Sequence, residues 1–200
     1  EDTAIFVVAD HGEMLGERGL WAKDCFFEWS MRVPFLAKIP GVSGGRRVSG
    51  NVSLVDLMPT LLDLAEVDPA ELSDPLAGQS LRGLLAGAGE DWPDQVFAEY
   101  SAEAAEAPMV MLRRGRYKFI QAEGDPPVLY DLATDPDELQ NLAHDPARAD
   151  LCSEFGREVA DRWDLAGLDS AIRLSQRQRA IVGDALARGR RESWDYQPQP

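Results

Sequence analysis

The chain opens with an unbroken apolar run that stops at a polar pair. Residues 4–9 (AIFVVA) are rich in β-branched side chains, and Asp10, His11 and Gly12 follow them directly. Such a run is typical of a buried parallel strand, and open α/β sheets bind ligands outside the carboxyl ends of their strands. The pattern therefore predicts a strand whose C-terminal tip carries a functional site.

Beyond this tip the pattern predicts a loop, a short strand and one clear helix. The glycine-rich stretch 12–19 favours a winding loop, and the apolar run 33–39, bounded by prolines, is typical of a short strand near a sheet edge. Residues 51–67 carry a broad apolar face and predict a helix, which Pro59 should delay or kink. An irregular connection follows, with one short helical turn near residues 80–85.

From residue 96 the apolar positions alternate with period two. This alternation predicts short strands joined by turns, with RRGR at 113–116 as a hairpin turn. The predicted strands are residues 96–100, 110–114, 117–120 and 128–132. They indicate a small antiparallel sheet, separate from the core that the first strand joins, and we expect a division into residues 1–95 and 96–200.

Helices are expected to close this second part. The acidic start of DPDELQNLA predicts a short helix over 135–143. Two amphipathic helices are predicted next, over residues 147–165 and 170–188, ending at Gly167 and Gly189. The polar and aromatic residues after them predict an extended tail.

Charge and composition exclude some classes of function. The 200 residues carry a net charge of −15, which argues against nucleic-acid binding because phosphates require clustered, uncompensated cations. Cys25 and Cys152 form no CxxC pattern and are expected to be reduced thiols. No run reaches the roughly 20 apolar residues of a membrane helix, so we expect no membrane contact. The start directly before a strand indicates the C-terminal part of a longer chain, so the missing signal peptide says little about the parent protein. Our expectation for that protein is a cytoplasmic location.

Asp10 and His11 are the first candidates for chemistry. At a strand-to-loop turn both side chains can converge on one point, but a metal site would need further carboxylates from elsewhere. Equally, Asp10 could cap the turn and His11 could be an incidental polar residue. Taken alone, Lys23 is typical of a solvated surface lysine.

Three segments resemble one known family. ADHGEMLGERGLWAKDCFFEWSMRVPFL resembles the segment that carries the second half of the metal site in sulfatases of the alkaline phosphatase superfamily. VSLVDLMPTLLDLA and LYDLATDPDELQNLA resemble two later signatures of that family, in the same order. GERGLWAKDCFFEWSMRVP, the RRGRYKF hairpin and the terminal WDYQP are most similar to choline-sulfatases. The resemblance implies an α/β fold class: the C-terminal part of an alkaline-phosphatase-like sulfatase fold, with a small antiparallel sheet subdomain and terminal helices.

The resemblance also implies roles for individual residues. Asp10 and His11 match the pair that binds a divalent cation, usually calcium or magnesium, and Lys23 matches the lysine that holds a sulfate oxygen. A cation and a lysine aimed at the same tetrahedral anion neutralise the charge that develops on the ester. Glu17 and Arg18 are expected to brace the loop rather than to touch substrate.

The family's nucleophile is absent from these residues. Sulfatases use a formylglycine made from Cys or Ser in a C/S-x-P-x-R motif, together with two acidic metal ligands, and the 200 residues contain no such motif. Phenylalanines follow Cys25, and Ser153 and Glu154 follow Cys152, so neither cysteine fits. We therefore expect the formylglycine in a missing N-terminal part, that N-terminal half as the partner, and no turnover of a small-molecule sulfate ester by these residues alone.

The sequence gives candidate residues for substrate recognition and for subunit assembly. A choline sulfate site must hold a quaternary ammonium, for which Glu99, Glu103 and Tyr100 are candidates, as are Trp194 and Tyr196 in the tail. The plain alternatives are that the acids are solvated surface carboxylates and that Trp194 anchors the tail. The family's use of its tail in subunit contacts implies a homo-oligomer.

Two other functions stay open. A site for a tetrahedral anion does not distinguish sulfur from phosphorus by these residues alone, so a phosphonate or phosphate ester hydrolase of the same superfamily is the second hypothesis. The third is a non-catalytic assembly module, in which the small sheet and the terminal helices mediate contacts and Asp10 binds no metal.

Overall fold

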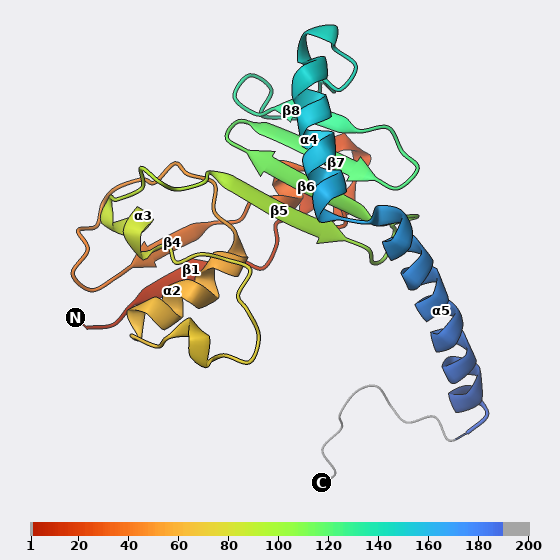
Figure 1. The fold of residues 1–200 in the computed structure, drawn as a ribbon, viewed down its shortest axis with the longest axis horizontal. Coiled ribbons are helices and arrows are strands. Elements are labelled where there is room, and N and C mark those ends of the chain that lie inside the picture. Colours follow the sequence, from red (N-terminus) through yellow and green to blue (C-terminus); the bar gives the residue numbers. More distant parts are fainter. Residues whose placement is uncertain (1, 190–200) are drawn as a thin grey trace.

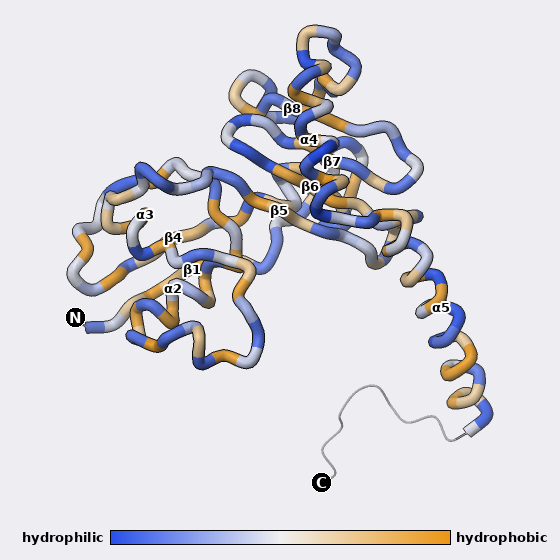
Figure 2. Tube along the Cα trace, in the orientation of Figure 1, coloured by the Kyte–Doolittle hydropathy of each residue, from blue (hydrophilic) through white to orange (hydrophobic). Residues whose placement is uncertain are grey.

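The computed structural model describes residues 2–189. Within this range a four-stranded sheet, β5–β8, lies beside a smaller group formed by β1, β4 and α2, as Figure 1 shows. Helix α4 crosses one face of the large sheet, and helix α5 extends away from the rest of the molecule. Figure 2 shows that apolar residues continue along α5 as it leaves the body.

The first strand forms, but not as a buried parallel strand. β1 (Ile5–Val8) pairs in antiparallel register with β4 (Phe35–Lys38), with Ile5 opposite Lys38. The side chains of Ile5 and Val7 are 48% and 54% exposed. Within the described residues the predicted parallel pairing and burial are not formed, because the chain returns through a loop that pairs β1 with β4, and no described residue covers Ile5 and Val7.

The predicted helix over 51–67 is confirmed with a late start. A single 3₁₀ turn, η2 (Leu54–Asp56), leads into α2 (Leu57–Leu64). Pro59 stands in the first turn of α2, where its missing N–H has no intrahelical partner to lose. The irregular connection that follows holds η3 (Pro69–Glu71) and α3 (Arg82–Ala86), which agrees with the predicted turn.

The antiparallel sheet is confirmed. Its strands pair in the order β5-β6-β7-β8, so each strand lies beside its neighbour in sequence. Gly115, at φ 55°, turns the hairpin between β6 and β7 as the RRGR pattern predicts. The bounds are β5 (Gln95–Tyr100), β6 (Met109–Arg114), β7 (Tyr117–Ala122) and β8 (Val128–Asp131).

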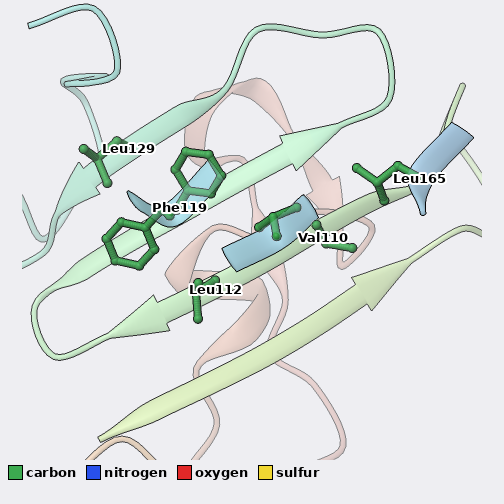
Figure 3. Close-up of a cluster of buried hydrophobic side chains, with 7 residues drawn as sticks. Val110, Leu112, Phe119, Leu129 and Leu165 are labelled. Atoms are coloured by element: carbon green, nitrogen blue, oxygen red, sulfur yellow. The ribbon is translucent and has the colours of Figure 1, made fainter. Parts of the chain in front are cut away.

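One face of this sheet forms the main core with α4 (Ala149–Arg162). Figure 3 shows the cluster of alternate strand residues that faces the helix. The rings of Phe119 and Phe155 stack at 5.7 Å between centroids, and both side chains are buried. The buried members are Val110, Leu112, Phe119, Leu129, Phe155, Val159 and Leu165.

The opposite face of the sheet is covered by the loop that follows β1. Figure 1 shows the ribbon of this loop behind β6 and β7, on the side away from α4. The loop contains the short pair β2 (Met14–Leu15) and β3 (Trp21–Ala22), the turn η1 (Glu17–Gly19) and the single-turn helix α1 (Glu28–Met31). The division at residue 95 stays a prediction.

The helix predicted over 135–143 is wrong. Those residues form turns, in which the Asp135 carboxylate accepts hydrogen bonds from the amides of Leu139 and Gln140 at 3.0 and 2.8 Å. Glu138 takes a positive φ of 57°, outside the helical region. The acidic start caps a turn instead, because the side chain of Glu138 is drawn into the interior.

The two terminal helices form with shifted bounds. η4 (Pro146–Arg148) precedes α4, which ends at Arg162, and α5 (Leu165–Ala187) begins two residues before Gly167. The Gly167 amide donates to Asp164 Oδ1 at 2.9 Å and thereby caps the start of α5. The predicted stop at Gly167 is therefore wrong, because Gly167 lies in the first turn of α5, where its amide takes part in the cap.

Candidate functional site

Asp10 and His11 lie side by side at the tip that follows β1. The Asp10 side chain is 87% exposed and that of His11 is 39% exposed, with His11 Nε2 3.5 Å from Asp10 Oδ2. The His11 amide also donates to Asp10 Oδ1 at 3.0 Å. The polar pair therefore converges on one exposed point.

The other ring nitrogen of His11 faces a backbone acceptor. Nδ1 is 2.7 Å from the carbonyl oxygen of Gly12, which cannot donate, so the proton is assigned to Nδ1. Nε2 then keeps its lone pair on the side of the Asp10 carboxylate. A carboxylate oxygen and an imidazole lone pair in this arrangement fit a divalent cation, with the second nitrogen oriented as metal-binding histidines usually are.

Further ligands do not come from the described part of the chain. Within residues 2–189, no three His, Cys, Asp or Glu side chains are close enough to hold one metal ion. Calcium, for example, takes six or more ligands, mostly oxygens. Asp10 and His11 can therefore supply only part of a metal site.

Gly12 lets the tip pack against α1. Its amide donates to the Ser30 carbonyl at 2.7 Å, and the next amide, of Glu13, donates to the Trp29 carbonyl at 2.9 Å. A β-carbon at Gly12 would lie 2.0 Å from the Trp29 carbonyl oxygen. Only glycine allows the tip to approach α1 this closely.

Lys23 is positioned by the same helical turn. Its carbonyl oxygen accepts from Ser30 Oγ at 2.5 Å and from the Cys25 amide at 2.8 Å. Its side chain is exposed and forms no ion pair with any residue between 2 and 189. Ser30, which is buried, therefore links the backbone of Lys23 to the backbone of the Asp10–His11 tip.

Glu99 lies in β5, and Glu103 lies in the turn that follows this strand. Glu99 Oε1 accepts from Trp163 Nε1 at 2.6 Å, so Glu99 lies on the face of the sheet that α4 covers. Successive strand residues point to opposite faces, and Tyr100 accordingly points to the covering loop. The structure does not bring Glu99 to Lys23.

Tyr100 brings the Glu103 segment to the Lys23 loop. Its hydroxyl lies 2.9 Å from Asp24 Oδ1 and 2.7 Å from the Glu103 carbonyl oxygen, and its single proton serves these two acceptors. Desolvation, together with the hydrogen bond to the Asp24 carboxylate, raises the pKa of Tyr100 to about 12. Asp24 is the neighbour of Lys23, so the backbone of the Glu103 segment is tied to the same loop.

Glu17 and Arg18 brace the loop as expected. Glu17 Oε2 accepts from the Leu15 amide at 2.6 Å. The Arg18 guanidinium stacks over the Phe27 ring at 4.1 Å and donates to the Asp137 carbonyl at 2.8 Å and to the Glu138 carbonyl. These contacts join the loop to the turn at 135–138.

Sequence reasoning missed a group of four charged residues beneath the loop, two of which, Lys118 and Glu138, are buried. Lys118, Glu28, Glu138 and Arg113 lie between the sheet and α1, and Lys118 is 0% exposed. Alternation in β7 correctly puts Lys118 on the face opposite Phe119, but a lysine on that face is expected to point to solvent. No sequence signal indicates that a loop some ninety residues earlier covers it.

The fold matches solved hydrolases of one superfamily. The structure of a 2-O GAG sulfatase aligns over 80% of this chain and 35% of that chain, with a TM-score of 0.70 and 30% identity. The phosphonate monoester hydrolase of Agrobacterium radiobacter aligns over 80% of this chain and 34% of that chain, with a TM-score of 0.69 and 33% identity. The fold is therefore the C-terminal part of an alkaline-phosphatase-like sulfatase fold.

Sequence comparison defines the family. The family described as N-sulphoglucosamine sulphohydrolase, C-terminal, matches residues 16–163, and the family described as choline sulfatase enzyme C terminal matches residues 170–200. The chain belongs to the sulfatase family.

A curated relative matches almost the whole chain. The choline-sulfatase of Rhizobium meliloti is 42% identical over 99% of this chain, which corresponds to 39% of the relative's length. The chain thus spans about two fifths of that relative. None of the helices within residues 2–189 is long and apolar enough to cross a membrane.

Proposed function

We propose that the chain is the C-terminal portion of a metal-dependent sulfatase that hydrolyses a choline-sulfate-like ester. The observation that carries the proposal is the common anchoring of Asp10, His11 and Lys23 on α1 through Gly12 and Ser30. The 42% identity to a choline-sulfatase supports the substrate class.

In this proposal Asp10 and His11 supply two ligands of a calcium or magnesium ion. Asp10 contributes a carboxylate oxygen and His11 contributes Nε2, while Nδ1 keeps its proton and donates it to the Gly12 carbonyl oxygen. The bound cation supplies positive charge next to the ester. Lys23 donates to a sulfate oxygen, and its exposed side chain is free to do so because no described residue pairs with it.

The nucleophile and the remaining ligands then come from an N-terminal portion. The C/S-x-P-x-R motif is absent from these 200 residues, so the chain alone is expected to be inactive. The exposed apolar side chains of Ile5, Val7 and Leu36 on β1 and β4 support a surface that such a portion covers.

Glu103 is the better candidate of the two acids for the choline ammonium. Tyr100 ties the backbone of Glu103 to the Lys23 loop, whereas Glu99 is occupied by Trp163 on the other face. A carboxylate and an aromatic ring near the sulfate site suit a quaternary ammonium. Trp194 and Tyr196, the other candidates, lie outside the described residues.

The proposal is tested by activity and by metal binding. The isolated chain is assayed for choline sulfate hydrolysis beside the full-length Rhizobium meliloti relative, and activity in the isolated chain would contradict the proposal. Calorimetric titration of the full-length protein with calcium and magnesium compares the wild type with Asp10→Asn. We expect binding to weaken at least tenfold in Asp10→Asn and not in Asp125→Asn, an exposed aspartate in the β7–β8 turn.

A phosphonate or phosphate ester hydrolase is the second candidate. The 33% identity and TM-score of 0.69 to a phosphonate monoester hydrolase favour it. Relative rates of the full-length protein on a sulfate monoester and on a phosphonate monoester decide between the two, and a faster phosphonate reaction would replace the first proposal.

Assembly through the C-terminal region is also proposed. Exposed apolar side chains on α5 support it, namely Leu174, Ile181, Val182 and Leu186. Sedimentation equilibrium of the full-length protein tests it, with an oligomer expected in the wild type and dissociation in Ile181→Asp. A non-catalytic assembly module would show the oligomer without any metal binding. The cytoplasmic location stays a prediction.

A further inference from the structure

The sheet carries a lysine that is entirely enclosed beneath the candidate site. Lys118, in β7, donates from Nζ to the Phe26 carbonyl at 2.9 Å, to Glu28 Oε1 at 2.6 Å and to Glu138 Oε1 at 2.8 Å. An ammonium has three protons, so each one has an acceptor. Lys118 is thus fully paired, and all its acceptors belong to the covering loop or to the 135–138 turn.

The two acids that face Lys118 are held by further contacts. Glu138 Oε2 accepts from the Glu28 amide at 2.7 Å, at the first residue of α1. Glu28 Oε2 also accepts from Arg113 Nη1 at 2.9 Å, on the neighbouring strand. Burial opposes ionisation of Glu28, but Lys118 and Arg113 outweigh it and hold the pKa of Glu28 below its ordinary value. The cluster is balanced, with two cations and two anions.

From this cluster the contacts continue to the candidate site. α1 is one turn long, and its first residue is Glu28. Two residues later, Ser30 binds the Gly12 amide through its carbonyl and the Lys23 carbonyl through its hydroxyl. An anchor on Glu28 therefore fixes both parts of the site, through the backbone of α1 and the two hydrogen bonds of Ser30.

We infer that Lys118 and Glu138 are positioning residues, which seat α1 on the sheet and thereby set the placement of the Asp10–His11 tip relative to Lys23. The catalytic meaning of this placement rests on the proposed function, but the placement itself does not. Buried ion pairs add little net stability, because desolvation offsets their attraction, and in some proteins their role is instead to fix one geometry. Removing Lys118 and Glu138 is therefore expected to make the covering loop more mobile while the sheet stays folded.

Hydrogen exchange on the chain separates positioning from general stability. The variant Lys118→Met/Glu138→Leu removes one cation and one anion and leaves Arg113 paired with Glu28. We expect exchange at the Gly12 and Glu13 amides to speed up at least tenfold, while the Leu112 amide, in the centre of the sheet, changes less than threefold.

The matched control removes an ion pair from the other face of the sheet. Arg114→Met/Glu158→Leu also deletes one cation and one anion, but on the α4 side, where the pair is 3.1 Å long. It is expected to leave the Gly12 and Glu13 amides unchanged relative to Leu112. Equal acceleration at Gly12 and Leu112 in the Lys118 variant, or none at Gly12, would overturn the inference.

A second measurement keeps the inference apart from the proposed function. In the full-length protein, the Lys118→Met/Glu138→Leu variant is expected to bind calcium at least tenfold more weakly than the wild type. Wild-type protein that binds neither calcium nor magnesium would defeat the proposed function, whereas the exchange data would still decide whether Lys118 and Glu138 position the loop.

Discussion

Ser30 Oγ lies 2.5 Å from the carbonyl oxygen of Lys23, and the Ser30 carbonyl accepts from the Gly12 amide at 2.7 Å. One buried residue thus joins the two stretches that carry the candidate site. The β2–β3 pair, with Met14 opposite Ala22, brings the two stretches side by side, and Ser30 ties both of them to α1.

Ser30→Ala removes the side-chain half of this link. The loss of one buried hydrogen bond is expected to cost about 1 kcal/mol of unfolding free energy. Urea unfolding measures the cost, and Ser73→Ala, at an exposed serine, is expected to cost less than about 0.5 kcal/mol. A loss no larger than that of the control would mean that the contact contributes nothing.

Gly12→Ala should displace the Asp10–His11 tip. The added carbon would lie 2.0 Å from the Trp29 carbonyl oxygen, which is backbone and cannot turn aside. We expect a cost of about 1–3 kcal/mol, in the range of other overpacked sites. In Gly183→Ala, on α5, a β-carbon meets no atom within 4 Å, and the substitution is expected to be neutral or stabilising by up to about 1 kcal/mol.

Tyr100→Phe deletes the hydroxyl that ties the Glu103 segment to Asp24. If Glu103 contacts the choline ammonium, KM for choline sulfate should rise several-fold in the full-length protein, with kcat nearly unchanged. Steady-state kinetics measures this split. An aryl sulfate without a cationic group provides the comparison, and an equal change in KM for both substrates would argue against recognition of the ammonium by Glu103.

Phe155→Ala tests the core between α4 and the sheet. Phe155 is buried and stacks on Phe119, so its truncation is expected to cost about 3–5 kcal/mol. Thermal and urea unfolding measure it. Leu186→Ala removes a side chain that is 67% exposed and should stay within about 0.5 kcal/mol of the wild type in the isolated chain.

Asp131 should make stability depend on acid pH. Two hydrogen bonds from Arg116, each 2.5 Å long, hold the pKa of Asp131 below its ordinary value of 3.8. A carboxyl whose pKa is lowered on folding stabilises the protein above its unfolded pKa, and that contribution is lost as the pH falls through the lower, folded pKa. The stability difference between the wild type and Asp131→Asn should therefore be constant above about pH 5 and shrink below pH 4. A difference that stays constant down to pH 2 would contradict this assignment.

Local patterns predicted much of the secondary structure. Period-two alternation located β5–β8, and Pro59 correctly marked the late start of α2. The 135–143 helix failed because the side chain of Glu138 is paired with Lys118 in the interior, and that long-range contact outweighs an acidic capping pattern. Residues 165–167 were misassigned because a glycine is typical of the end of a helix. Here the Gly167 amide donates to Asp164, so this glycine lies at the beginning of one.

The sequence also predicted one part of the candidate site and missed another. Asp10, His11 and Lys23 were predicted from the sequence as candidates, because a strand tip and a family motif are local features of the chain. Residues that act through tertiary contacts were not found, since nothing local distinguishes the buried Lys118 from a solvated lysine on a strand.

The sequence by itself determined the family, the alternation of the second sheet and the residue types at the strand tip, all of which are encoded in neighbouring positions. Only the tertiary structure decided which face of the sheet the 13–31 loop covers, and that Glu99 pairs with Trp163 while the Glu103 backbone is tied to the Lys23 loop. It also decided that Ser30 joins Gly12 to Lys23. These relationships depend on hydrogen bonds between segments distant in sequence, such as the one from Lys118 to Phe26, and the chain forms them only when it folds.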